Sequence, residues 1–77
     1  MSKKLKKAFG SAMKATRKRA GLSQLRLSAL SGLDRTYISD LERGEFYASL
    51  DTIFRLADAM KVSAAEIIKR TADELDK

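Results

Sequence analysis

Residues 21–44 read GLSQLRLSALSGLDRTYISDLERG, two short runs of helical periodicity separated by a turn that contains Gly32. Ser23 and Asp34 stand directly before the runs, where serine and aspartate commonly cap helices through their side-chain oxygens. Glycine follows each run, as it often does just beyond a helix end. The pattern predicts two helices joined by a tight turn, a helix-turn-helix arrangement over about residues 23–43.

The rest of the chain also has helical periodicity, with no sustained alternation typical of a strand. Ser63 and Glu66 have the spacing of a capping box, which marks the start of the last helix. We expect one all-α domain of five helices over residues 1–77, with residues 1–4 and 76–77 frayed. The expected helices cover residues 5–20, 24–31, 35–43, 50–60 and 64–75. The fourth opens after Ser49, and its expected core face is Leu50, Ile53, Ala57 and Met60.

The third expected helix has two different faces. Ile38 and Leu41 can meet Leu27 and Leu33 in a shared core, because these apolar residues recur at helical spacing. The opposite face carries short or hydrogen-bonding side chains, together with one long arginine. Such a face can enter the DNA major groove and present donors and acceptors to base edges. Its members are Arg35, Thr36, Ser39 and Asp40.

The composition excludes several classes of protein. The chain has 77 residues, with no cysteine and no histidine, which excludes a disulfide scaffold, a zinc finger and a Cys/His catalytic pair. No apolar run is long enough to cross a membrane. We therefore expect a cytoplasmic protein of bacterial or phage type that is not an enzyme and binds no metal, cofactor, small-molecule ligand or membrane.

The charge is concentrated at one end of the chain. Residues 1–26 hold nine lysines and arginines and no acid, within a net charge of +6 for the whole sequence. Such clustering indicates a polyanionic partner, namely DNA, RNA or an anionic membrane surface, although a solubilising face is the plainer interpretation. Few aromatics are present to stack RNA bases, and Gly10 interrupts the apolar stripe that a membrane would need. The lysines of residues 1–7 form either a solvated tail or a groove contact.

The stretch from about Phe9 to Ile68 resembles the Cro/CI/Xre-type helix-turn-helix family of DNA-binding regulators. Within that family it looks most like the controller proteins of restriction–modification systems, and the resemblance implies a compact five-helix fold of the lambda-repressor (Cro/CI) type. It rests on the segments Gly21–Gln24, Gly32–Ser39, Leu41–Gly44, Ser49–Ile53 and Leu56–Ala57.

The resemblance also implies roles for matching positions. Arg17 and Glu42 match residues that form a buried ion pair between the first and third helices. Base contacts are implied at or beside Asp34, Arg35, Thr36, Ser39 and Asp40, although Asp34 also suits a helix cap. Phosphate contacts are expected from Gln24, Arg26, Tyr37, Arg43 and Tyr47, with Arg26 standing where the family commonly has an acid.

Apolar residues beyond the needs of one core face favour a dimer. Ile67 and Ile68 point about 100° apart on a helix, so both cannot face the same core. We expect a homodimer whose two recognition helices lie one DNA turn apart on a roughly palindromic operator. Its interface is expected to include Phe54, Ile68, Ala72 and Leu75. The alternative is a monomer whose last helix packs on two sides. Leu25 and Leu30, at usually polar positions, favour an alternative: a protein-interaction module, such as an antitoxin or adaptor.

Overall fold

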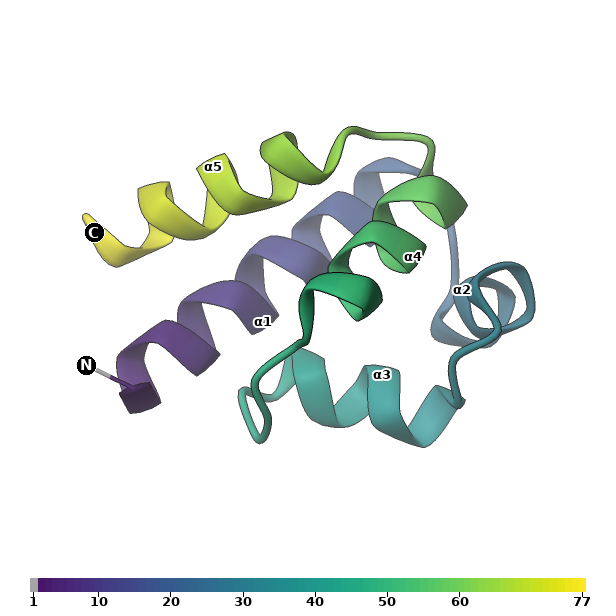
Figure 1. Cartoon of the computed structure of the whole chain (residues 1–77), viewed down its shortest axis with the longest axis horizontal. Helices are drawn as coiled ribbons and strands as arrows, with labels where there is room; N and C mark the ends of the chain where they lie inside the picture. Colours follow the sequence, from purple (N-terminus) through teal and green to yellow (C-terminus); the bar gives the residue numbers. More distant parts are fainter. Residues whose placement is uncertain (1) are drawn as a thin grey trace.

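The computed structural model describes residues 2–77, which contain helices and no strand (Figure 1). The all-α, five-helix architecture expected from the sequence is therefore confirmed. The helices are α1 (Ser2–Arg19), α2 (Gln24–Ser31), α3 (Arg35–Glu42), α4 (Leu50–Met60) and α5 (Ala64–Leu75).

The long helix α1 runs through the middle of the molecule (Figure 1). Helix α5 packs along one side of it, α3 lies on the other side, and α2 and α4 close the end opposite the chain termini. No helix within residues 2–77 has the length and apolar character that crossing a membrane would require. The arrangement leaves the outer face of α3 on the surface.

The short helices begin where the sequence places their caps. Each cap residue has an extended backbone, and its side-chain oxygen accepts a backbone N–H two or three residues later, at 3.0–3.1 Å. The capping box of α5 is only half formed, because the Glu66 carboxylate accepts instead from Arg70 Nε at 3.2 Å. The four cap residues are Ser23, Asp34, Ser49 and Ser63.

The first helix is longer than predicted. It begins at Ser2 rather than Leu5, so residues 2–4, which we expected to be frayed, are helical. Lysine and leucine have good helix propensity, and the first glycine is not reached until Gly10. Met1 lies outside the described residues. Helix α5 ends at Leu75, as expected.

The core lies between α1, α3, α4 and α5, with Leu27 contributed by α2. Of the expected core residues of the central helices, Leu27, Ile38 and Leu41 are fully buried, and Leu33 packs against their edge. The expectation that Leu50 faces the core is wrong, because its side chain is 72 % exposed. Leu50 is the first residue of α4, and the buried face of that helix begins only at Thr52.

Candidate nucleic-acid interface

Helix α3 presents a polar face to solvent and an apolar face to the core. Arg35 and Thr36 are exposed, Ser39 and Asp40 are half-buried, and Ile38 is fully buried. The four polar residues follow helical spacing and so share one side of α3. The structure therefore brings together the residues that the sequence assigned to base recognition.

The start of this face is fixed by Asp34. Its Oδ2 accepts the backbone N–H of Thr36 at 3.0 Å, which satisfies one of the free N–H groups at the helix N-terminus. One carboxylate oxygen is thus used by the cap and the other is left over. Asp34 orients Arg35 and Thr36 through the backbone, whether or not it also meets a base.

The end of the face is neutralised within the protein. Arg43 donates from Nη1 to Ser39 Oγ at 2.9 Å and forms an ion pair with Asp40 through Nη2. Ser39 and Asp40, which were predicted to contact bases, are therefore both bound to Arg43, which was predicted to contact a phosphate. Within residues 2–77, Arg35 forms no ion pair and is the free cation of this face.

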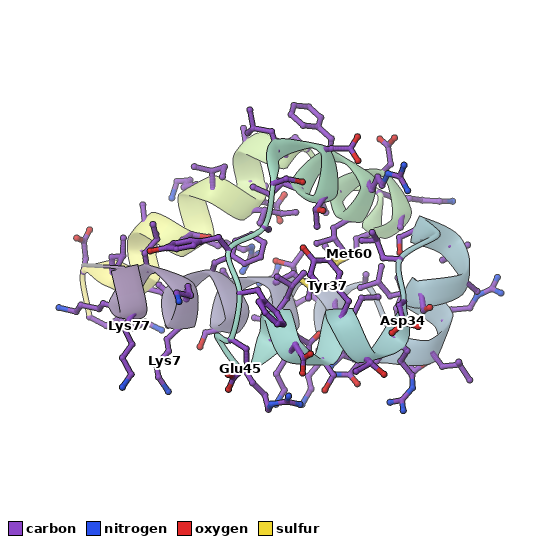
Figure 2. All side chains as sticks on the ribbon, turned by 60° about the horizontal axis from the view of Figure 1, so that its bottom comes forward. Lys7, Asp34, Tyr37, Glu45, Met60 and Lys77 are labelled. Carbon is purple, nitrogen blue, oxygen red and sulfur yellow. The ribbon has the colours of Figure 1, made fainter. Side chains whose placement is uncertain are left out.

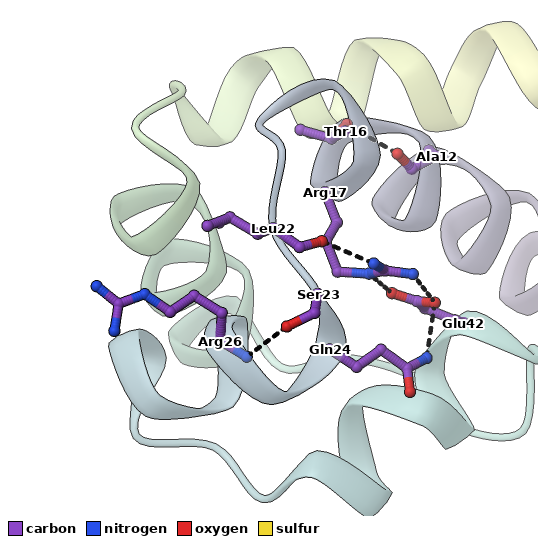
Figure 3. Close-up of polar contacts among 8 residues, drawn as sticks. All are labelled: Ala12, Thr16, Arg17, Leu22, Ser23, Gln24, Arg26 and Glu42. Atoms are coloured by element: carbon purple, nitrogen blue, oxygen red, sulfur yellow. Dashed lines mark hydrogen bonds and ion pairs between the residues drawn. The ribbon is translucent and has the colours of Figure 1, made fainter.

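A buried ion pair joins α1 to α3 (Figure 3). Arg17 donates from Nε to Glu42 Oε2 at 2.6 Å and from Nη2 to Glu42 Oε1 at 3.0 Å. The two side chains are only 9 % and 4 % exposed. Arg17 Nη1 also donates to the Leu22 carbonyl at 2.8 Å, which fixes the loop before α2.

Helix α2 joins the same network through Gln24. Its Nε2 donates to Glu42 Oε1 at 2.9 Å, so one carboxylate receives hydrogen bonds from two other helices. An amide nitrogen carries two hydrogens, and one of those on Gln24 is left for another acceptor. Gln24 is thus placed to brace α3 while donating outward from the start of α2.

A glycine that the sequence analysis treated only as an interruption also positions α3. A Cβ on Gly10 would stand 2.5 Å from the Leu41 carbonyl oxygen and 2.6 Å from that of Glu42, so α1 touches the backbone at the end of α3. Only glycine permits that approach. The signal was present in the sequence, because a glycine inside a strong helix costs stability and needs a packing reason.

The two tyrosines differ in burial, because Tyr37 packs against the edge of the core whereas Tyr47 lies on the surface. Tyr37 is half-buried, with its ring centroid 6.3 Å from that of Phe46. Tyr47 is exposed, and Lys6 Nζ lies 5.0 Å from its ring centroid. Phe46, which the sequence analysis did not single out, therefore supports the position of Tyr37.

Arg26 is placed apart from the other predicted phosphate contacts. Its side chain points away from Gln24 and Glu42 (Figure 3). It lines a surface groove together with Leu30 at the end of α2 and Lys61 at the end of α4. Arg26 comes two residues after Gln24 on α2, so its side chain lies on a different side of the helix from the one that contacts Glu42.

The predicted dimer residues lie on the surface of α4 and α5. Phe54 is 60 % exposed, Ile68 is 49 % exposed, Ala72 is exposed and Leu75 is half-buried. Ile68 also borders an apolar hollow of about 150 Å³ beside the loop that precedes α4. The exposed apolar surface thus extends beyond the predicted dimer residues and includes Phe46, Tyr47 and Leu50.

Acidic groups do not gather into a metal site within residues 2–77, where no cluster of three or more ligand-type side chains occurs. The polar chemistry of the site is instead that of hydrogen-bond donors, acceptors and fixed cations around α3.

Comparison with known proteins gives consistent matches. A family described as "Helix-turn-helix" matches residues 13–67. The uncharacterized HTH-type transcriptional regulator y4dJ of Sinorhizobium fredii is 36 % identical over 67 residues, covering 87 % of each chain. The restriction–modification controller protein C.AhdI from Aeromonas hydrophila has a similar structure, with a TM-score of 0.78 and 40 % identity over 80 % of this chain and 94 % of that one.

A further solved structure, the controller protein C.Esp1396I, is a tetramer in complex with its natural 35-base-pair operator. It has a TM-score of 0.85 to this chain and 27 % sequence identity, over 95 % of this chain and 96 % of that one.

Proposed function

The chain belongs to the helix-turn-helix family of the Cro/CI type, and from this membership we propose that it is a sequence-specific DNA-binding transcription regulator. It resembles the controller proteins of restriction–modification systems. The observation that supports the proposal most directly is the outer face of α3, which carries Arg35 beside the hydroxyl groups of Thr36 and Ser39. This role needs no catalytic residue.

Sequence is read from α3 in the major groove. Arg35 has the donor geometry to bind guanine O6 and N7 together, and such a pair discriminates against a wrong base by about 1–3 kcal/mol. Thr36 and Ser39 offer hydroxyls that hydrogen-bond several base edges. Asp40 suits the exocyclic amine of cytosine, once Arg43 turns from it toward a phosphate.

Phosphate contacts hold the protein in register on the duplex. Gln24 donates its second amide hydrogen to one strand from the start of α2. Arg43 and Tyr47 lie in the segment between α3 and α4 and reach toward the backbone of the DNA. Tyr37 adds a hydroxyl at the edge of the same surface, and Arg26 supplies positive charge from the far side of α2.

The active unit is a homodimer. Phe54, Ile68, Ala72 and Leu75 form its twofold interface, which would cover apolar surface that the single chain leaves exposed. Twofold symmetry sets the two α3 helices about 34 Å apart, one DNA turn, and requires a roughly palindromic site. Operator DNA as the partner places the protein in the cytoplasm, on the nucleoid.

Selection from random duplex DNA tests the proposal. We expect a palindromic sequence to be enriched, and Arg35→Ala to lose about 1–3 kcal/mol of discrimination at one base pair of each half-site. Lys69→Ala on α5 is the control, because it removes one exposed cation from a helix remote from α3. Recovery of no preferred sequence by the wild-type protein contradicts the proposal.

A second candidate function rests on α2. Leu25 is 69 % exposed, and Leu30 is also exposed, which suits a protein-interaction module such as an antitoxin or adaptor. In that case Leu25→Lys with Leu30→Lys abolishes binding of the protein partner, whereas Arg35→Ala leaves it unchanged. Measured partner affinity that is insensitive to both leucine substitutions rules this function out.

A further inference from the structure

Lys3 and Lys7 stand one helical turn apart on α1, and both are exposed. Neither forms an ion pair within the described residues, whereas Arg17 on the same helix is fully paired. Residues four apart on a helix are neighbours on its surface, so the two ammonium groups form one cationic strip.

This strip borders the C-terminal end of α3. A Cβ on Gly44, just after α3, would stand 2.9 Å from Lys7 Cγ and 3.0 Å from Lys7 Cα. One turn further along α1, Gly10 touches the last carbonyls of α3. Figure 2 shows the Lys7 side chain projecting to the same side of the molecule as Glu45, which follows α3. The strip therefore continues the surface that α3 presents.

The strip is unfavourable for the isolated chain. Lys3, in the first turn of α1, opposes the helix dipole, and that turn has no acid to offset it. Like charges four residues apart also repel each other. The two positive charges do not stabilise the free fold, but a row of phosphates would favour both.

We propose that Lys3 and Lys7 bind phosphates of the DNA just outside the base pairs read by α3, and so extend the interface along α1. This inference rests on the proposed function, because it takes α3 to lie in the major groove. The two lysines act as a phosphate-binding helix face and contribute affinity without sequence choice.

The test measures binding of Lys7→Gln and of the double variant Lys3→Gln/Lys7→Gln at 50–200 mM salt. The duplexes are the operator selected by the wild-type protein and an unrelated sequence of the same length. Glutamine keeps the Cγ atom that lies beside Gly44. Lys69→Gln is the matched control, because it removes the same charge from α5, away from α3.

For the dimer, Lys7→Gln removes two phosphate contacts, which lowers the slope of log K against log salt by about 1.8. The affinity advantage of the wild type over the variant then shrinks by about 12-fold between 50 and 200 mM salt. We expect the same change on both duplexes, no change for Lys69→Gln, and a melting temperature for Lys7→Gln at or above that of the wild type.

An unchanged slope for both lysine variants overturns the inference, and so does an equal loss in Lys69→Gln, which would make the effect one of net charge. A wild-type protein that prefers no sequence overturns the proposed function instead. The slope comparison on the unrelated duplex remains valid in that case, so the two failures are distinguishable.

Discussion

Gly10→Ala separates helix propensity from packing, because the two act in opposite directions at this position. Alanine in the interior of a helix is about 1 kcal/mol more favourable than glycine. In α1, however, the added Cβ would lie 2.5 Å and 2.6 Å from two carbonyl oxygens at the end of α3, and 2.9 Å from the Glu42 carbonyl carbon. These are backbone atoms, so no side-chain rotation relieves the overlap.

The overlap therefore moves α3 away from α1. Overpacking of this kind costs about 1–3 kcal/mol. Because α3 carries Glu42, its displacement also stretches the hydrogen bonds of 2.6 and 3.0 Å to Arg17. After the gain in propensity is subtracted, we expect the free energy of unfolding to fall by up to about 2 kcal/mol.

Urea unfolding monitored by circular dichroism measures this change, with operator affinity measured in parallel. Ser11→Ala is the control, since Ser11 is exposed on α1 beside Gly10 and alanine there changes propensity without a new contact. We expect Ser11→Ala to be neutral or slightly stabilising. The packing argument is refuted if Gly10→Ala stabilises the protein by about 1 kcal/mol, the value that propensity alone gives.

Three further predictions test the network, the turn after α4 and the dimer. Glu42→Ala leaves Arg17 buried without its partner, and we expect urea unfolding to show a loss of about 3–5 kcal/mol. Asp73→Ala breaks an exposed ion pair and is expected to cost less than about 1 kcal/mol. Similar losses in the two variants would contradict burial of the network. Lys61→Gly removes a side chain from a left-handed residue with φ of 59°, and thermal unfolding is expected to show a gain of up to about 1 kcal/mol, where a loss would contradict backbone strain. Phe54→Lys places a charge in the proposed interface, so sedimentation velocity is expected to give a monomer at concentrations where the wild type is a dimer; an unchanged mass would exclude Phe54 from that interface.

Features that depend on residues close together in the chain could be predicted from the sequence. The caps at Ser23, Asp34 and Ser49 depend on a side chain and a backbone N–H two or three residues away, so their residue types predict them directly. Gly32 adopts a left-handed conformation with φ of 74°, which glycine reaches without steric cost and which ends α2 as expected. The all-α class follows from the same local information.

Features that depend on contacts between residues far apart in the chain were harder to predict from the sequence. The pairing of Arg17 with Glu42, 25 residues apart, was suggested by family resemblance rather than by spacing. The approach of Gly10 to α3 was missed, because sequence periodicity does not show which helices touch. Leu50 was misplaced for a related reason: at the first turn of α4 its burial depends on where the neighbouring helices end.

The occupation of Asp40 by Arg43 shows a different limit. Asp40 was predicted on the polar face of α3 and Arg43 as a phosphate contact, but residue type alone does not say which partner a flexible side chain takes. In the free protein the partners of Arg43 are internal. In the proposed complex a DNA phosphate would compete for the same guanidinium, so base recognition by Asp40 would depend on an exchange of partners, whereas Arg35 forms no ion pair within residues 2–77.

The dependence of α3 on its neighbours links folding to recognition. A helix of eight residues is not stable alone, so its position comes from the Asp34 cap at one end and from Glu42 at the other. Helix α1 supplies two of the constraints at the Glu42 end, the Arg17 ion pair and the Gly10 contact. The same helix carries the lysine strip. Under the proposed function, substitutions in α1 therefore alter DNA binding by two routes: displacement of α3 weakens base discrimination, whereas loss of a lysine lowers affinity for every sequence and reduces the salt slope.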